Sequence, residues 1–413
     1  EGVRDIYGPE CARKLAVQEK ILQVFRLYGY EAIETPVFEY FDIFSKDRGS
    51  VGQRELFKFF DRDNNMLVLR PDMTPAVARC VAKYFMDDDM PLRLCYLERT
   101  FKNNTSYQGY LKERAESGAE LIGDDSPDAE MIAMVIDCLK AAGLKEFQVE
   151  LGEVAFYRSL LQQAGLDEDA QVQLNDLIEN KNRFGVEEFL KNQDMEESLK
   201  EAFLKLPELF GGINQIKKAK TLTDNPQALA AVERLERVHT LLEEYHMADY
   251  VSYDLGMLSR YQYYTGIIFK AYTYGTGDYI VPGGRYNKLL VQYGKDTPAV
   301  GFAIVVDQLM AALSRQQIHI PIQLVNAVIL YEPSARQSAV RLSRFFRSEG
   351  TPVQSMVMEE GKSLEDYKGM AKKRGLRTIL CLRDTGNTVT AFDMLTGNVD
   401  ETPVTAYGVR EIV

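Results

Sequence analysis

The stretch LFKFFDRDNNMLVLRPDMTPAVAR, residues 56–79, places a hairpin signal directly before a helix signal. Its aromatic half, the polar Asp-Arg-Asp-Asn-Asn segment and its aliphatic half predict a β-hairpin over residues 54–70. Thr74 followed by Pro75 predicts a helix over residues 74–85, with the threonine as its N-cap. A sheet with helices packed against it is therefore expected.

The chain on both sides of this stretch alternates between helix and strand patterns. We expect a helix at residues 10–29, strands at 91–101 and 113–123, and a helix at 126–143. Ser126 is the expected N-cap of the last helix, and Gly143 its expected end.

The middle of the chain changes character. Residues 155–246 are rich in Glu, Leu, Gln and Lys, which predicts a helical insertion. Strand patterns return over residues 250–284. The pair Gly283-Gly284 could cradle a phosphate but more often marks a hairpin turn, with a helix expected near 285–293. Residues 297–313 predict a strand that runs into a helix.

The last segment has its own pattern. Polar residues and a proline interrupt the chain around 314–325, and buried-type strands then alternate with amphipathic helices. This βαβαβ order predicts a small parallel-sheet domain. We expect a core over residues 1–320 and a second α/β domain over 325–413.

Composition excludes several classes of protein. A net charge of −12 over 413 residues argues against a general nucleic-acid binder, which needs a basic face. No apolar run approaches the roughly 20 residues that span a bilayer. Five widely spaced cysteines are typical of reduced cytosolic thiols, so we expect a cytoplasmic protein. Three histidines and no Cys-x-x-Cys motif give no basis for a metal site.

Polar residues inside apolar strands are the candidates for chemistry. Glu116, Gly118 and Glu120 recur with period two and so lie on one strand face. With Tyr264 and Tyr286 they could form a pocket whose carboxylates hold an ammonium or imidazolium group. Alternatively, the carboxylates face solvent on a one-sided sheet and the tyrosines are core residues. Spacing alone favours this second interpretation.

The motifs together resemble a known family, the class II aminoacyl-tRNA synthetases of the histidyl type. The matching segments are GVRDI, YGYEAIETPVFEY, LFKFFDRDNNMLVLRPDMTPAVAR, GAELIGDDSPDAEMIAM, YYTGIIFKAY, GGRYNKLL and TPAVGFAI, over roughly residues 2–313. The resemblance implies an α+β fold with a mixed, mainly antiparallel sheet flanked by helices and a helical insertion. The last domain resembles the family's anticodon-binding domain.

The resemblance also shows where the chain departs from a working synthetase. Adenylation needs guanidinium groups that stabilise charge developing on the ATP phosphate. Lys102, Ser259 and Gln308 stand where the family has three arginines, and Arg260 lies one position after the second. A lysine does not replace the bidentate guanidinium, so the resemblance implies no adenylation and no catalytic residue.

Much of the family's histidine-binding set is retained. Glu116 replaces a glutamine, and Tyr110 stands near an expected arginine, so a partner for the histidine carboxylate is lost. The residues that match the family's set, with a carboxylate at the first position, are Asp72, Thr74, Glu120, Tyr263, Tyr264 and Tyr286.

This pattern is similar to a paralogous family, the regulatory subunits of ATP phosphoribosyltransferase. That family implies a homodimeric core within a hetero-oligomer, the short catalytic chain as partner, and L-histidine as effector in histidine biosynthesis. It implies no cofactor, no membrane and no tRNA. Two alternatives stay open: a divergent active histidyl-tRNA synthetase, and a free-standing protein that binds histidine or tRNA.

Overall fold

The computed structural model describes residues 2–44, 52–87, 90–104, 111–258, 263–322, 325–384 and 386–407. The chain divides into two compact units. One unit comprises Glu1–Ile6 and Lys14–Ile320, and the other comprises Tyr7–Arg13 and Pro321–Val413.

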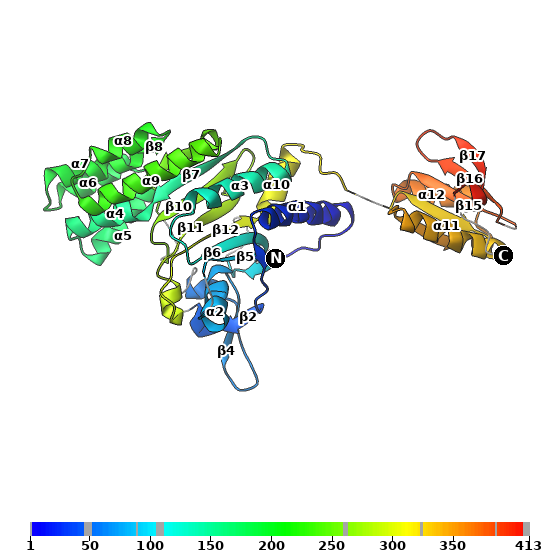
Figure 1. Cartoon of the computed structure of the whole chain (residues 1–413), viewed down its shortest axis with the longest axis horizontal. Helices are drawn as coiled ribbons and strands as arrows, with labels where there is room; N and C mark the ends of the chain where they lie inside the picture. Colours follow the sequence, from blue (N-terminus) through cyan, green and yellow to red (C-terminus); the bar gives the residue numbers. More distant parts are fainter. Residues whose placement is uncertain are drawn as a thin grey trace. The chain divides into compact units, whose positions relative to one another are not determined.

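A nine-stranded sheet forms the centre of the larger unit (Figure 1). Its order is β1 (Glu31–Ala32), β5 (Leu92–Phe101), β6 (Glu113–Ile122), β12 (Ala299–Val305), β11 (Val281–Arg285), β10 (Ile267–Thr273), β7 (Phe147–Glu153), β9 (Val251–Asp254) and β8 (Phe210–Gly211). Neighbouring strands are antiparallel except the pairs β1–β5 and β7–β9. The predicted mixed, mainly antiparallel sheet is confirmed.

Helices pack on this sheet and extend beyond one end of it. Those of the core are α1 (Gly8–Leu27), α2 (Thr74–Tyr84), α3 (Asp128–Ala142) and α10 (Val306–Arg315). The insertion contains α4 (Val154–Ala164), α5 (Glu168–Glu179), α6 (Arg183–Lys191), α7 (Glu197–Lys205), α8 (Asn214–Lys220) and α9 (Pro226–Glu244). In Figure 1 the insertion helices gather beside β7 and β10, which α9 and α4 contact.

The predicted hairpin forms part of a small three-stranded sheet. Strand β4 (Met66–Leu69) lies between β2 (Phe38–Tyr40) and β3 (Lys58–Phe60), antiparallel to both. Arg70 follows β4 and is fully buried. Its guanidinium donates to the carbonyl oxygens of Thr35 and Arg99, at 2.7 and 2.8 Å, and pairs with Glu98. Arg70 therefore fixes the backbone just before Asp72.

Three local predictions in the core are wrong, and in the first of them a tertiary contact prevails. Thr74 does not cap α2, since its hydroxyl donates to a side chain on β6. Ser126 does not cap α3, because its hydroxyl donates to Asp124. The helix expected near 285–293 is a short 3-10 segment, Leu290–Tyr293.

The Gly283-Gly284 pair lies inside β11 and does not form a turn. A Cβ at Gly283 would lie 2.2 Å from the ring of Phe269, and a Cβ at Gly284 would lie 2.8 Å from the ring of Tyr264. Both glycines are therefore required by side chains that cross the strand closely, which a local turn rule cannot detect.

The smaller unit has a five-stranded sheet of order β14-β13-β15-β16-β17. Its elements are β13 (Ala327–Tyr331), α11 (Arg336–Ser348), β14 (Val353–Val357), α12 (Leu364–Lys373), β15 (Thr378–Leu382), β16 (Thr388–Asp393) and β17 (Val399–Pro403). The first three strands are parallel as predicted, but β16 and β17 add an antiparallel edge. No helix in the described part of the chain is long and apolar enough to cross a membrane.

The glycine packing in β11 generates a stability prediction. Gly283→Ala should lower the free energy of unfolding by about 1–3 kcal/mol, because its methyl group would overlap the Phe269 ring. Chemical denaturation followed by circular dichroism measures the change. Gly277→Ala is the control, since nothing lies within 4 Å of a Cβ there, and it should change stability by less than about 0.5 kcal/mol. Equal effects of the two substitutions would contradict this account.

Candidate functional site

Glu120, on β6, is a fully buried carboxyl group that accepts hydrogen bonds from three hydroxyls. Thr74 donates to its Oε1 at 2.9 Å, and Tyr96 donates to the same oxygen at 3.4 Å. Tyr286 donates to its Oε2 at 2.5 Å. A Cβ at Gly301, opposite on β12, would lie 1.6 Å from Oε2. Glycine at that position is therefore what lets the carboxyl group lie flat against the sheet.

Burial controls the protonation of this group. It raises the pKa of Glu120 to about 8, and the nearby charge of Asp72 acts in the same direction. The three hydroxyl donors oppose the shift because they stabilise the carboxylate form. The carboxyl group is therefore largely protonated at neutral pH.

Asp72 lies between the end of the hairpin and the first turn of α2. Its Oδ1 accepts from the backbone N–H of Thr74 at 3.1 Å, and its Oδ2 accepts from the hydroxyl of Tyr263 at 3.0 Å. The Tyr263 ring lies 4.9 Å from the ring centre of Tyr264 and 6.0 Å from that of Tyr286. The three tyrosines thus form one aromatic group beside the carboxyls.

Glu116 is the third carboxyl group and lies on the same face of β6. Its side chain accepts from the hydroxyl of Thr100 at 2.9 Å. Burial raises the pKa of Glu116, Lys102 lowers it and Asp72 raises it. Because Glu116 and Glu120 are 8% and 0% exposed, the interpretation with solvent-facing carboxylates is wrong.

These residues form one group, called here the Glu120 cluster. It comprises Asp72, Thr74, Tyr96, Thr100, Glu116, Glu120, Tyr263, Tyr264 and Tyr286. The structure thus brings together every residue of the predicted histidine-binding set. Tyr96 and Thr100 were missed, although both recur with period two along the predicted strand at 91–101.

The positions that replace the synthetase arginines are only partly described. Lys102 follows β5, is half-buried and acts on Glu116 electrostatically. Gln308 lies half-buried in the first turn of α10. Ser259, Arg260 and Tyr110 lie outside the described residues.

A second buried ion network connects the cluster to the helical insertion. Arg285, the neighbour of Tyr286, donates through Nε to Asp128 of α3 at 2.8 Å. Arg234 of α9 donates through Nε to the other oxygen of Asp128, also at 2.8 Å. Asp128 is 2% exposed, so the two guanidinium groups compensate a carboxylate that has left water. Asp128 with Arg234 and Arg285 is called here the Asp128 clasp. Sequence spacing gave no signal for it.

Glu153 lies close to this network. It ends β7, is 2% exposed and caps α4 by accepting from the backbone N–H of Ala155 at 3.1 Å. Burial raises the pKa of Glu153 to about 8. The described residues include no group of three or more His, Cys, Asp or Glu side chains that could hold a metal ion.

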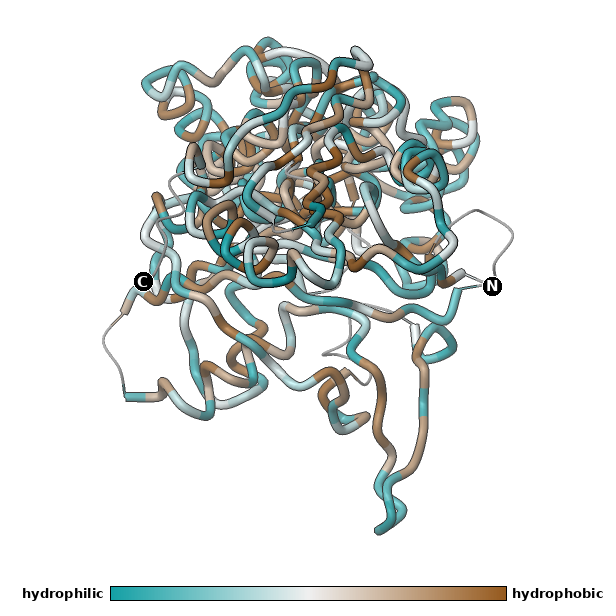
Figure 2. The backbone as a smooth tube through the Cα atoms, turned by 90° about the vertical axis from the view of Figure 1, so that its right-hand side faces the viewer, coloured by the Kyte–Doolittle hydropathy of each residue, from teal (hydrophilic) through white to brown (hydrophobic). Residues whose placement is uncertain are grey.

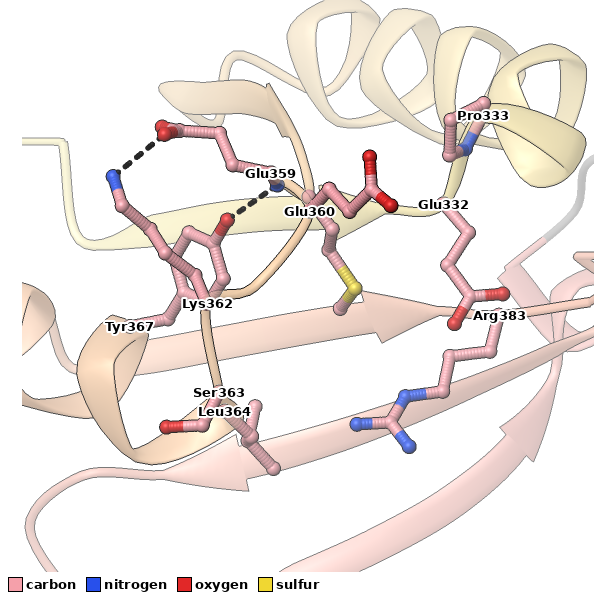
Figure 3. A pocket seen from close by; sticks show the side chains of 10 residues that line it. Glu332, Pro333, Glu359, Glu360, Lys362, Ser363, Leu364, Tyr367 and Arg383 are labelled. Atoms are coloured by element: carbon pink, nitrogen blue, oxygen red, sulfur yellow. Dashed lines mark hydrogen bonds and ion pairs between the residues drawn. The ribbon is translucent and has the colours of Figure 1, made fainter.

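The smaller unit has a hollow of about 560 Å³ at the carboxyl ends of β13, β14 and β15 (Figure 3). Its charged lining is three glutamates against one lysine and one arginine: Glu332, Glu359, Glu360, Lys362 and Arg383. Lys362 is paired with Glu359 at 2.8 Å, and the hydroxyl of Tyr367 accepts from the Glu359 backbone N–H. An acidic lining is poorly suited to a phosphate backbone.

The fold and the cluster define a protein of the class II histidyl-tRNA synthetase type, and the sequence matches the Histidyl-tRNA synthetase family over residues 2–309. The chain belongs to the family of ATP phosphoribosyltransferase regulatory subunits. It is 36% identical to the regulatory subunit of Acetivibrio thermocellus over 389 residues, 94% of this chain and 93% of the relative. It is also 36% identical to that of Ruminiclostridium cellulolyticum, over 97% of this chain and 96% of the relative.

Solved structures agree with this assignment. An ATP phosphoribosyltransferase regulatory subunit/histidyl-tRNA synthetase from Bacillus halodurans has a TM-score of 0.82 at 30% identity, covering 93% of this chain and 97% of the other. A histidyl-tRNA synthetase from Nostoc sp. PCC 7120 has a TM-score of 0.81 at 19% identity, covering 99% and 97%, and shares the fold. The predicted fold and the predicted regulatory subunit, a non-catalytic synthetase paralogue, are confirmed.

The protonation of Glu120 makes stability depend on pH. Its pKa is raised from 4.5 to about 8 by folding, so its stabilising contribution is complete below 4.5 and is lost as pH rises through 8. Glu120→Gln cannot ionise, so its unfolding free energy should fall less steeply than wild type between these values. The difference in slope should reach about 1.4 kcal/mol per pH unit.

Denaturation curves recorded every half unit between pH 5 and 9 measure this slope. Glu113→Gln is the matched control, on the same strand, where the carboxylate pairs with the exposed Arg99. The control should keep the wild-type slope. A Glu120→Gln slope equal to that of wild type would exclude a buried, protonated carboxyl group.

Proposed function

We propose that the chain acts as the regulatory partner of a short catalytic chain of ATP phosphoribosyltransferase in histidine biosynthesis. The family relationship supports this proposal, because the relatives aligned over nearly their whole length carry the name of that enzyme's regulatory subunit. In this proposal the catalytic chain transfers the phosphoribosyl group, and the present chain sets its activity.

The state of the former adenylation site is the observation that carries the proposal. At described positions, Lys102 and Gln308 stand where the synthetases have arginines. A lysine presents a single point charge, and a glutamine presents none, so neither supplies the planar fork that clamps a phosphate. The carboxyl and tyrosine groups remain, which supports ligand binding without ATP chemistry.

L-histidine is the proposed effector. The proposed binding residues are Asp72, Thr74, Glu116, Glu120, Tyr263, Tyr264 and Tyr286. Carboxyl groups suit an ammonium or an imidazole N–H, and tyrosine rings suit stacking on the imidazole. Feedback through this site requires two states of the complex that differ in histidine affinity.

The three-stranded sheet supports a homodimeric core. Phe38, Tyr40 and Phe59 lie on one face of it and are 53%, 58% and 38% exposed. Phe38 packs edge-on against Phe59, with ring centres 6.1 Å apart. Figure 2 shows the apolar strands of this sheet leading to a hydrophilic hairpin tip. An uncovered aromatic face of this kind is typical of an interface, and we propose a second copy as its partner.

One observation favours the alternative of a divergent synthetase. The smaller unit has a five-stranded sheet, and the Bacillus halodurans relative carries both names in its description. The net charge of −12 and the acidic hollow argue against tRNA binding.

All five cysteines are free, which supports the proposal of a cytoplasmic protein.

Co-expression tests the proposed partnership. The purified chain should co-elute with a short phosphoribosyltransferase chain from the same organism and raise its turnover, which alone should be near background. The same preparation should show no ATP–pyrophosphate exchange with histidine, with an active histidyl-tRNA synthetase as positive control. Clear exchange would favour the divergent synthetase, and separate elution would favour a free-standing binding protein.

The dimer proposal has its own test. Phe38→Glu places a charge on the aromatic face and should shift the chain from dimer to monomer in light scattering. Phe184→Glu, on the insertion helix α6, is the control because that phenylalanine is 73% exposed outside this face. An unchanged dimer in the Phe38→Glu variant would place the interface elsewhere.

A further inference from the structure

Five of the six side-chain hydroxyls in the Glu120 cluster are already engaged by its own carboxyl groups. Five hydroxyls donate to them, from Thr74, Tyr96, Thr100, Tyr263 and Tyr286. Each hydroxyl has one O–H group, so each of these donors has its acceptor within the protein. A ligand carboxylate, which can only accept, would have to displace one of these bonds.

Acceptors, in contrast, are plentiful. A carboxylate has about four lone-pair sites. Glu116 accepts one side-chain hydroxyl, Asp72 accepts a hydroxyl and a backbone N–H, and Glu120 accepts three hydroxyls. Glu116 and Asp72 therefore still offer acceptors to an ammonium group and to an imidazole N–H.

The charges of the cluster act in the same direction. Asp72 raises the pKa values of both Glu116 and Glu120, so its charge repels the ionised form of each. Lys102 and Arg114 offset this repulsion at Glu116. A ligand cation relieves this repulsion, whereas a ligand carboxylate adds a further negative charge beside Asp72, in a site where Glu116 and Glu120 are 8% and 0% exposed.

We propose that the Glu120 cluster prefers an imidazole ligand that carries an amine and no carboxylate, and that Glu116 is the residue that disfavours the carboxylate. The proposal rests on the proposed function for the imidazole part of the ligand. L-histidinol and histamine represent the preferred class, and L-histidine binds the same residues more weakly. Discrimination of this kind comes from repulsion of the wrong ligand.

Calorimetric titration of the full-length chain tests the preference. L-histidinol and histamine should bind at least about tenfold more tightly than L-histidine, because one ionic repulsion separates them. L-histidine methyl ester should bind like L-histidinol, since its carboxyl group is uncharged. This ester separates the effect of charge from that of size.

Variants test the role of Glu116. Glu116→Gln should reduce the preference for L-histidinol to about threefold or less, mainly by improving L-histidine binding. Glu113→Gln, three residues earlier on β6 and paired with Arg99, should keep the full preference. Asp72→Asn provides a second variant, on another element, and should also narrow the gap.

Three outcomes would overturn the proposal. They are equal or tighter binding of L-histidine, a preference unchanged by both Glu116→Gln and Asp72→Asn, and no binding of any of the imidazole ligands. Co-elution with the phosphoribosyltransferase chain is measured separately. A folded variant that still co-elutes therefore distinguishes failure of this ligand proposal from failure of the proposed function.

Discussion

A fully buried carboxyl group determines how the core of this protein is arranged. Glu120 accepts hydrogen bonds from Thr74 at the start of α2, from Tyr96 on β5 and from Tyr286 in the segment after β11. A buried carboxyl group is tolerated only when its oxygens are satisfied, so these three elements must meet at one point. Gly301 on β12 completes the arrangement because any side chain there would occupy the space of the carboxyl group.

The elements of the fold were largely accessible from the sequence, because periodicity and turn residues report local structure. Their ends were less accessible. Threonine is a residue type favoured at N-caps, yet the hydroxyl of Thr74 donates to Glu120, 46 residues further along the chain. Glycine is typical of turns, yet Gly283 is needed because the ring of Phe269 leaves no room for a side chain there. In both positions a distant partner prevailed over local propensity.

The residues of the site could be predicted from the sequence, but whether they are buried or exposed could not. Period two placed Glu116 and Glu120 on one face, but spacing cannot tell whether water or protein lies on that face. Family resemblance supplied the tyrosines and Asp72, whereas Tyr96 and Thr100 could have been found by the same alternation on β5. Antiparallel strands β16 and β17 were missed because short polar strands give a weak hydrophobic signal.

The Asp128 clasp has a consequence for how this chain can be altered. The helical insertion contributes Arg234, one of the two guanidinium groups that enclose a buried carboxylate of the core. Excision of residues 155–246 would therefore leave Asp128 with Arg285 alone, in a cavity opened to solvent beside Tyr286. The insertion is not an independent module. An insertion transplanted from a relative would have to place its own arginine at the same point.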